Sequence, residues 1–392
     1  GTGKTMVAAF DYARSCEALG GRPRLLFVAH RAQILVQAMY TYREVLHDRA
    51  FGELLGDGEL PEQWDHVFAT IQSITSKGII ALKGASFWHT VVVDECHRIV
   101  ADTFHAFVSL VKPKILLGLT ATPERSDGNS IMPYFDNRPD GSPAVELRLW
   151  TALDLQLLAP FEYYGCDDET DFSEVPWDRA GETAALEGLL ITDNTRRARL
   201  IVDEWQRLSG NAHVSRALVF CVSVAHAEYM TKYFNNVGLP SGCVVGSTSK
   251  ADREAALRKL QQGTICAIVT CDMYNEGIDI PEVNVILLLR PTQSPVLFQQ
   301  QIGRGLRLVQ GKDACLVLDF VGRFRTDFRI DTLYRAITGL SRAGLVEALE
   351  HGFTKLPPGC HIHLDKQPRD RILNAIRSEE HTSELQSRPV IS

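Results

Sequence analysis

The feature that most constrains the fold of this chain is a run of three valines that ends in two carboxylates. It covers residues 90–95, Thr-Val-Val-Val-Asp-Glu. Consecutive β-branched residues without polar alternation are typical of a strand buried in the middle of a parallel sheet. Asp94 and Glu95 then lie at the carboxyl end of that strand, where open α/β sheets bind ligands. Two such acids suit a metal-bound nucleotide, and a solvated strand end accounts for them equally well.

Further apolar runs of strand length alternate with helical patterns along most of the chain. They cover residues 25–29, 67–74 and 115–119 in the first part, and 217–222, 242–245, 265–270, 283–289 and 315–320 in the second. Strands that alternate with helices indicate parallel sheets with helical crossovers. Because 392 residues exceed what one hydrophobic core usually supports, we predict an α/β fold with two tandem parallel-sheet domains.

Changes in composition indicate where these domains begin and end. From Glu124 to about Arg179, glycine, proline, aspartate and asparagine become frequent and the strand pattern is lost, as in loops and connectors. The predicted order is a first domain over 1–150, a connector over 151–185, a second domain over 186–322 and a small, mainly helical C-terminal extension over 323–376.

Two clusters of potential metal ligands are interpreted as structural. The acidic run at 167–171 reads as a solvated loop within the connector. His361 and His363 beside Cys360 could suggest a metal site. Alternate polar residues are more typical of a short strand with one polar face, and we favour that interpretation.

Both ends of the chain are unusual. It begins at Gly1 inside a motif and without methionine, so we expect an N-terminally truncated first domain. Residues 377–392 resemble an open-frame translation of a widely used short-read sequencing adapter, and we set them aside as an artefact. A genuine polar tail is the alternative, and either interpretation predicts disorder.

Composition limits the classes of partner and compartment. No apolar run approaches the roughly 18 residues that span a bilayer, so no membrane partner is expected. The nine cysteines are scattered without a C-x-x-C pair, as reduced core thiols are, which favours a reducing cytoplasm. The net charge of −7 argues against coating of nucleic acid by bulk positive charge. A local cleft of hydroxyls, amides and a few arginines remains compatible with it.

The first five residues, Gly-Thr-Gly-Lys-Thr, open a helical stretch that runs to about Leu19. They match the second half of the phosphate-loop pattern G-x-x-x-x-G-K-[ST]. In such a loop the backbone N–H groups face phosphates, Lys4 reaches the β- and γ-phosphates, and Thr5 ligates Mg²⁺. Gly-Lys-Thr also occurs in ordinary surface turns, so this motif needs support from the rest of the chain.

Residues 298–308 hold Gln300, Arg304 and Arg307 at i, i+4 and i+7, which places them on one face if the stretch is helical. Gly303 and Gly305 each cost about 1 kcal/mol relative to alanine in a helix interior. A solvent-facing basic surface does not explain the two glycines. We therefore interpret them as allowing close approach to an anionic ligand.

A second polar stretch, residues 269–281, lies just before the arginines. It places Thr270 at a strand end, followed by a loop with Glu276, Gly277 and Asp279. A hydroxyl at a strand end suits a nucleic-acid phosphate. A carboxylate further along could bind a ribose hydroxyl or hold an arginine.

Taken in order, these stretches resemble the superfamily 2 helicases and translocases, over about residues 1–125 and 215–310. The resemblance implies two RecA-like domains of the P-loop NTPase class that close on ATP and Mg²⁺ and move on nucleic acid. Residues 94–98, Asp-Glu-Cys-His-Arg, match the DExH box, and with residues 120–125 they are closer to the restriction-enzyme translocases than to DEAD-box RNA helicases. Residues 135–177 and 356–363 further resemble multidomain bacterial helicases that carry an upstream phospholipase-D-like nuclease.

The resemblance also assigns a role to individual residues. Those implied to bind ATP are Gly1, Thr2, Gly3, Lys4, Thr5, Gly277 and Asp279, with Thr5 and Asp94 holding Mg²⁺. Those implied to act in hydrolysis are Glu95, which activates the water, Arg304 and Arg307 as fingers on the γ-phosphate, Gln300 and His97. Those implied to contact nucleic acid are His30, Arg31, Thr70, Gln72, Val222 and Thr270, and those implied to couple hydrolysis to movement are Thr120 and Thr122.

The implied function is that of an ATP hydrolase which couples turnover to movement on DNA, as a helicase or a translocase. Two alternatives stay open at this point. The chain could act on RNA, or it could be a nucleic-acid-binding scaffold without catalytic activity.

Overall fold

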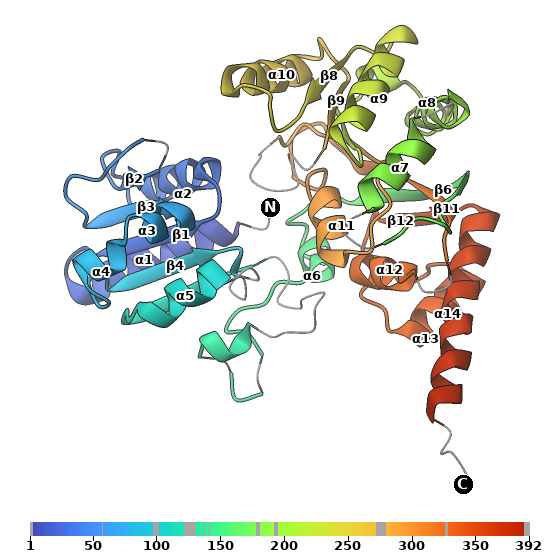
Figure 1. The fold of residues 1–392 in the computed structure, drawn as a ribbon. Helices are drawn as coiled ribbons and strands as arrows, with labels where there is room; N and C mark the ends of the chain where they lie inside the picture. Colours follow the sequence, from blue (N-terminus) through green and yellow to red (C-terminus); the bar gives the residue numbers. More distant parts are fainter. Residues whose placement is uncertain are drawn as a thin grey trace. The chain divides into compact units, whose positions relative to one another are not determined.

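The computed structural model describes residues 3–56, 58–96, 102–120, 131–136, 138–140, 142–177, 181–191, 195–271, 280–325 and 328–387. The chain divides into two compact units, Gly1–Glu146 and Leu147–Ser392. Each unit contains a parallel sheet with helices on both faces (Figure 1). The predicted α/β class with two tandem sheet domains is confirmed.

The first unit follows an alternating order of strands and helices (Figure 1). Its elements are α1 (Lys4–Leu19), β1 (Leu25–Ala29), α2 (Ala32–Val45), β2 (Glu53–Leu55), β3 (His66–Thr70), α3 (Ile71–Ser76), α4 (Ile79–Lys83), β4 (Thr90–Asp94), α5 (Asp102–Leu110), β5 (Ile115–Leu119) and the 3₁₀ turn η2 (Met132–Tyr134). The predicted strand at 67–74 is wrong beyond Thr70, because the hydroxyl of Thr70 caps a helix there.

The sheet of the first unit has the order β2-β3-β1-β4-β5, and its neighbouring strands are parallel. Phe27 of β1 lies opposite Phe68 of β3 and Val92 of β4, and these side chains pack under α1 and α2. Leu26 and Val28 face the other way and pack with α3, α4 and α5. The valine run thus supplies an interior strand, between β1 and β5, with apolar side chains on both faces, as its composition predicts.

The second unit is larger and ends in the long helix α14 (Figure 1). Its elements are α6 (Leu149–Asp154), β6 (Phe161–Asp171), α7 (Glu182–Leu190), α8 (Thr195–Ser209), the 3₁₀ turn η3 (Ala212–Val214), β7 (Ala217–Phe220), α9 (Val224–Asn236), β8 (Ser241–Val244), α10 (Lys250–Gln262), β9 (Ala267–Thr270), β10 (Val285–Leu288), α11 (Pro295–Ile302), β11 (Cys315–Arg323), α12 (Ile330–Thr338), α13 (Arg342–His351), β12 (His361–Leu364) and α14 (Lys366–Ser387).

The second sheet has the order β12-β6-β11-β10-β7-β9-β8, with parallel neighbours. One face packs on α8 and α9 through strand residues such as Val219 and Leu287. The other face packs on α10–α14 through residues such as Phe220 and Leu288. Ser249 caps α10 by accepting a hydrogen bond from the N–H of Asp252, as the sequence predicts.

The predicted connector contains a strand of this second sheet, so the interpretation of 151–185 as loop is wrong for β6. Phe161 and Tyr163 are buried, and β6 pairs with β11 and β12. The acidic run is the second half of this strand and not a solvated loop, because Asp168 is buried against Arg197. This strand forms because it pairs with β11 and β12, about 150 and 200 residues further along the chain, and local composition does not reveal such distant partners.

The C-terminal part is joined to the same sheet. Residues 361–364 form β12, whose histidines are exposed while Ile362 is buried, which confirms the predicted strand with one polar face. Within the part of the chain that the structure describes, no group of three or more His, Cys, Asp or Glu could hold a metal ion. The predicted disorder after residue 376 is wrong as far as Ser387, because α14 continues. Buried Ile372 and Ile376 anchor this helix, and each residue then extends it without a new nucleation cost. No helix in the described ranges is both long and apolar enough to cross a bilayer.

Candidate active site

A lysine and two carboxylates meet in the first unit, where α1 begins and β4 ends. Gly3 precedes α1 with φ of +77°, a left-handed conformation that favours glycine. Lys4 is the first residue of the helix, and its Nζ donates to Oε1 of Glu95 at 2.9 Å. The two side chains are 27% and 13% exposed, so the pair is only partly screened by water. The structure therefore brings together the predicted phosphate-binding lysine and the predicted catalytic carboxylate.

Asp94 and Glu95 have different environments although they are adjacent. Asp94 is buried at the last position of β4, whereas Glu95 has φ of +50°, which turns the chain sharply. The N–H of Glu95 donates to Oδ1 of Asp94 at 3.0 Å. Burial and the charge of Glu95 raise the pKa of Asp94 to about 6, and Lys4 opposes this shift.

These groups fit a magnesium ion. Mg²⁺ prefers oxygen ligands, and one or two carboxylates are usually enough. Asp94 supplies a carboxylate whose ionised form is disfavoured by burial, so a divalent cation beside it would lower its pKa and stabilise its charge. Thr5 supplies a hydroxyl in the first turn of α1. Asp94 and Thr5 are therefore the residues that would hold the ion.

The remaining predicted residues of the first unit follow neighbouring strands. His30 and Arg31 come after β1, Thr70 ends β3, and Thr120 follows β5. Because these strands are parallel neighbours, their carboxyl ends share one edge of the sheet with Asp94. The prediction that polar residues gather at this edge is thus supported by the strand order.

Thr70 has a structural role that sequence reasoning missed. Its Oγ1 accepts from the N–H of Ser73 at 3.2 Å and donates to the Ser73 hydroxyl at 2.8 Å. Gln72 in the same helix is exposed. The hydroxyl at this strand end is therefore engaged in a helix cap, and the spacing Thr-x-x-Ser is the signal that could have shown it.

In the second unit the arginine stretch is not one helix. α11 ends at Ile302 and Gly303 is its C-cap, so the prediction that Gln300, Arg304 and Arg307 share a helical face is wrong. A Cβ on Gly305 would lie 2.2 Å from Sγ of Cys315. Gly305 is therefore required by packing on β11, which corrects its interpretation as room for an anion. Both arginines lie in the loop after the helix.

Two residues predicted to contact nucleic acid are buried instead. Thr270 is inaccessible, and its hydroxyl donates to the carbonyl of Val244 at 2.7 Å, so it joins β9 to β8. Val222 packs in a cluster with Phe172 and Leu186, and its N–H donates to Nδ1 of His226 at 3.4 Å. A period-two strand pattern alone does not show which face a terminal hydroxyl takes. Both assignments are therefore corrected.

Six predicted site residues lie outside the described part of the chain. They are Gly1, Thr2, His97, Thr122, Gly277 and Asp279.

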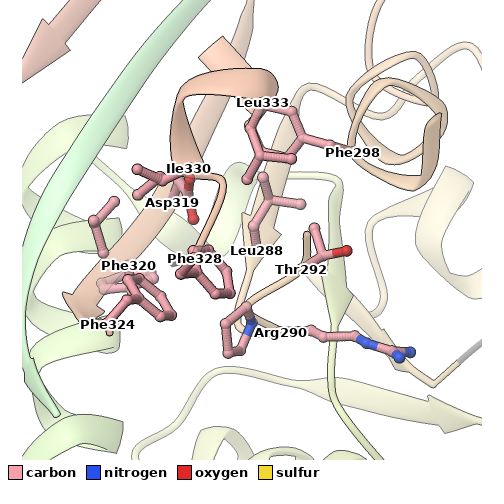
Figure 2. Close-up of a pocket in the computed structure, with 12 residues that line it drawn as sticks. Leu288, Arg290, Thr292, Phe298, Asp319, Phe320, Phe324, Phe328, Ile330 and Leu333 are labelled. Atoms are coloured by element: carbon pink, nitrogen blue, oxygen red, sulfur yellow. The ribbon is translucent and has the colours of Figure 1, made fainter. Parts of the chain in front are cut away.

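A small cavity of about 20 Å³ lies at the carboxyl ends of β10 and β11, beside α11. Figure 2 shows Asp319 and Phe298 at its wall, while the side chain of Arg290 extends away from the phenylalanines. Tyr163 donates a hydrogen bond to Asp319, and its hydroxyl lies 3.2 Å from that of Tyr334. Burial raises the pKa of Asp319 to about 6. The tyrosines stabilise this carboxylate within the core, so we assign the cluster a structural role.

His226 is a buried residue that sequence reasoning missed. Burial, with a smaller contribution from Arg197, lowers its pKa to about 3. The unfolded chain binds a proton near pH 6.5, and the folded chain does not until about pH 3. This histidine thus contributes stability above pH 6.5 that is lost as the pH falls towards 3.

We predict that His226→Asn, which keeps an acceptor for the N–H of Val222, removes this pH dependence. As the pH falls from 6 to 4, the unfolding free energy of the wild-type chain should decrease by about 1.4 kcal/mol per pH unit relative to that of the variant. Urea unfolding of both proteins measures the difference, in which the opposite contribution of Asp319 cancels. His213→Asn, at an exposed position, is the control. Parallel pH profiles for wild type and His226→Asn would contradict the prediction.

Comparison with known proteins places these features in a family. The model for the type III restriction enzyme, res subunit, matches residues 1–125, and the model for the helicase conserved C-terminal domain matches residues 200–309. The chain is similar to the yeast (Saccharomyces cerevisiae) protein "Putative ATP-dependent helicase IRC3", with 26% identity over 310 residues, which cover 77% of this chain and 44% of that protein. It is also similar to the type I restriction enzyme EcoAI endonuclease subunit of Escherichia coli, with 25% identity over 82% of this chain and 42% of that subunit.

A solved structure has a fold similar to that of this chain. The ATP-dependent type ISP restriction-modification enzyme LlaBIII bound to DNA superposes with a TM-score of 0.66 and 17% identity, over 97% of this chain and 31% of that enzyme. The chain spans less than half the length of the two curated relatives. With both family models in this order and a lysine–carboxylate pair where α1 begins and β4 ends, the chain belongs to the superfamily 2 helicases, in their restriction-enzyme-like group.

Proposed function

We propose that the chain is the two-domain motor of an ATP-dependent DNA helicase or translocase. The observation that carries this proposal is the ion pair between Lys4 and Glu95 beside buried Asp94. A lysine, a metal-binding carboxylate and a second carboxylate are the groups that phosphoryl transfer to water requires. The match to the restriction-enzyme family favours DNA over RNA as the nucleic acid along which the motor moves.

Lys4 and Glu95 exchange partners in the proposed mechanism. Without nucleotide Lys4 pairs with Glu95, which keeps both charges partly compensated. When phosphates are bound, Lys4 turns to them and no longer pairs with Glu95, whose carboxylate then orients and deprotonates a water. Asp94 and Thr5 would hold Mg²⁺, and the bound ion would neutralise phosphate charge. In this proposal the ion pair between Lys4 and Glu95 breaks when the substrate binds.

The second unit contributes cations to the same reaction in our proposal. Arg304 and Arg307 would stabilise the charge that develops on the γ-phosphate, with Gln300 orienting the water. Arginine fingers in related phosphoryl-transfer sites contribute roughly 10³–10⁵ in rate. Nucleic acid would contact His30 and Arg31 after β1 and Gln72 in α3, and Thr120 would couple hydrolysis to movement.

The protein that contains this motor is proposed to be larger and bacterial. The yeast and Escherichia coli relatives named above are more than twice as long as the matched region, and we propose further domains upstream, including a nuclease. All nine cysteines are free thiols, which supports a reducing cytoplasm as its compartment.

Phosphate release with Mg²⁺ and ATP tests the function. We expect the chain to hydrolyse ATP slowly alone and at least about tenfold faster with DNA, with a smaller effect of RNA at equal nucleotide concentration. Displacement of a third strand from a DNA triplex reports translocation, and separation of a labelled duplex reports helicase activity. Stimulation by RNA alone would make the chain an RNA helicase. Binding of DNA without any hydrolysis would make it a scaffold.

A further inference from the structure

The two proposed finger residues lie in an irregular loop that must be held in place by its surroundings. Residues 303–314 form neither helix nor strand. Packing of Gly305 on Cys315 fixes the start of the loop. The carbonyl of Leu306 accepts from the N–H of Ala159 at 2.8 Å, which fixes its middle. The position of the Arg307 main chain then depends on what holds its own peptide group.

That contact comes from Lys312. Its Nζ donates to the carbonyl of Arg307 at 2.9 Å and to the carbonyl of Pro281 at 3.2 Å. Pro281 lies in a tight turn in which the N–H of Val283 donates to the carbonyl of Ile280 at 3.2 Å, and both of those side chains are buried. One ammonium group therefore joins the main chain at Arg307 to an anchored turn in a different segment.

The environment of Lys312 distinguishes it from an ordinary surface lysine. It is partly buried, and burial lowers its pKa. Removing an ammonium group from water is unfavourable unless its donors find acceptors. Here two main-chain carbonyls accept from it, and hydrogen bonds from a charged donor are stronger than neutral ones. By contrast, Lys259 on α10 is exposed.

We propose that Lys312 is a positioning residue that fixes the main chain of Arg307 to the turn at Pro281. It thereby sets the direction in which the Arg307 guanidinium leaves the loop. The role in hydrolysis rests on the proposed function, whereas the bridge between the two segments does not. Pro281 ends the stretch 269–281 that the sequence assigns to nucleotide and nucleic-acid contacts, so Lys312 links the backbones of two proposed functional segments.

Three variants separate the bridge from a general effect on folding. Lys312→Met keeps the aliphatic stem and removes the donors, Lys312→Arg restores donors, and Lys259→Met is the matched control at an exposed site. Hydrogen exchange should be about tenfold faster in Lys312→Met at amides 304–309 and 282–284, and normal in the control. The arginine variant should restore most of the protection.

Steady-state ATP hydrolysis with DNA supplies the second measurement. We expect kcat to fall about 10- to 100-fold in Lys312→Met, because a misplacement of about 1 Å in a catalytic group has such effects. KM for ATP should stay within about twofold, since the phosphate-binding Lys4 is in the other unit. Lys312→Arg should reverse at least half of the increase in activation free energy that Lys312→Met causes.

The outcomes are distinguishable. Unchanged exchange in Lys312→Met shows that Lys312 does not hold the loop and overturns the inference. Faster exchange with unchanged kcat reduces Lys312 to a structural residue and also overturns it. If the wild-type chain hydrolyses no ATP, the proposed function fails by itself, and the exchange experiment still decides whether Lys312 bridges the two segments.

Discussion

Replacing Glu95 with glutamine should lower DNA-stimulated ATP turnover by about 10²–10⁴-fold, the usual contribution of a positioned general base. Glutamine has nearly the same shape as glutamate but does not accept the proton of the attacking water. The backbone turn at Glu95, with its φ of +50°, should persist because the side-chain size is conserved. The loss should therefore appear in kcat and not in folding.

The ion pair makes a second, less obvious prediction for the same variant. Lys4 is bound to Glu95 at 2.9 Å, so nucleotide phosphates must compete with this carboxylate for the lysine. Glutamine removes the charge that competes. ATP affinity of Glu95→Gln should thus equal or exceed that of the wild-type chain, although its turnover is lost.

Measurement of ATP affinity and turnover on the same variant tests the assignment of Glu95 as the general base. Fluorescent-nucleotide titration gives the Kd, and phosphate release gives kcat. Glu17→Gln, an identical change at an exposed position of α1, should alter neither. Asp94→Asn should differ from Glu95→Gln by weakening Mg²⁺-dependent binding, because it removes the proposed metal ligand. Turnover of Glu95→Gln at the wild-type rate would show that another group is the base.

The residues around Glu95 were predictable because parallel sheets make the ends of neighbouring strands meet. The valine run specifies a buried interior strand, so the position of Asp94 and Glu95 at its carboxyl end follows from local sequence. Lys4 could be paired with them once the phosphate-loop pattern was recognised. What local sequence did not show was that Lys4 and Glu95 contact each other, because that contact joins residues 91 positions apart.

Three of the failed predictions share a physical cause, which is dependence on distant partners. The need for glycine at 305 follows from β11 packing against the loop. Thr270 turns inward because the Val244 carbonyl of a neighbouring strand accepts its hydroxyl. The strand β6 was missed because its partners β11 and β12 are far away in sequence. Patterns with period 2 or 3.6 identify elements but not the neighbours of their last residues.

The buried pair of Arg197 and Asp168 should give the largest change in stability. Nε of Arg197 donates to Oδ2 of Asp168 at 2.7 Å, and the two side chains are 3% and 2% exposed. Oδ1 of Asp168 also accepts from the N–H and hydroxyl of Thr170. The pair ties α8 to the acidic half of β6, which the sequence alone assigned to a solvated loop.

Arg197→Met should therefore destabilise the second unit by about 3–5 kcal/mol, because it leaves a buried carboxylate without its cation. The next residue offers a matched control, since Arg196 pairs with Glu169 at the same distance of 2.7 Å with 84% and 62% of the side chains exposed. Arg196→Met should cost no more than about 1 kcal/mol. Asp168→Asn in the Arg197→Met background should restore part of the loss, because it removes the uncompensated charge.

Urea unfolding, followed by hydrogen exchange of peptides from α8 and β6, measures the unfolding free energy of the second unit alone. This separation is needed because two units need not unfold together. The comparison depends on burial and not on geometry, since both ion pairs have the same length. If Arg197→Met and Arg196→Met lowered the unfolding free energy equally, the stabilisation could not come from the buried pair. A large loss confined to Arg197→Met would show that β6 is fixed in the sheet by a charge pair that crosses from α8.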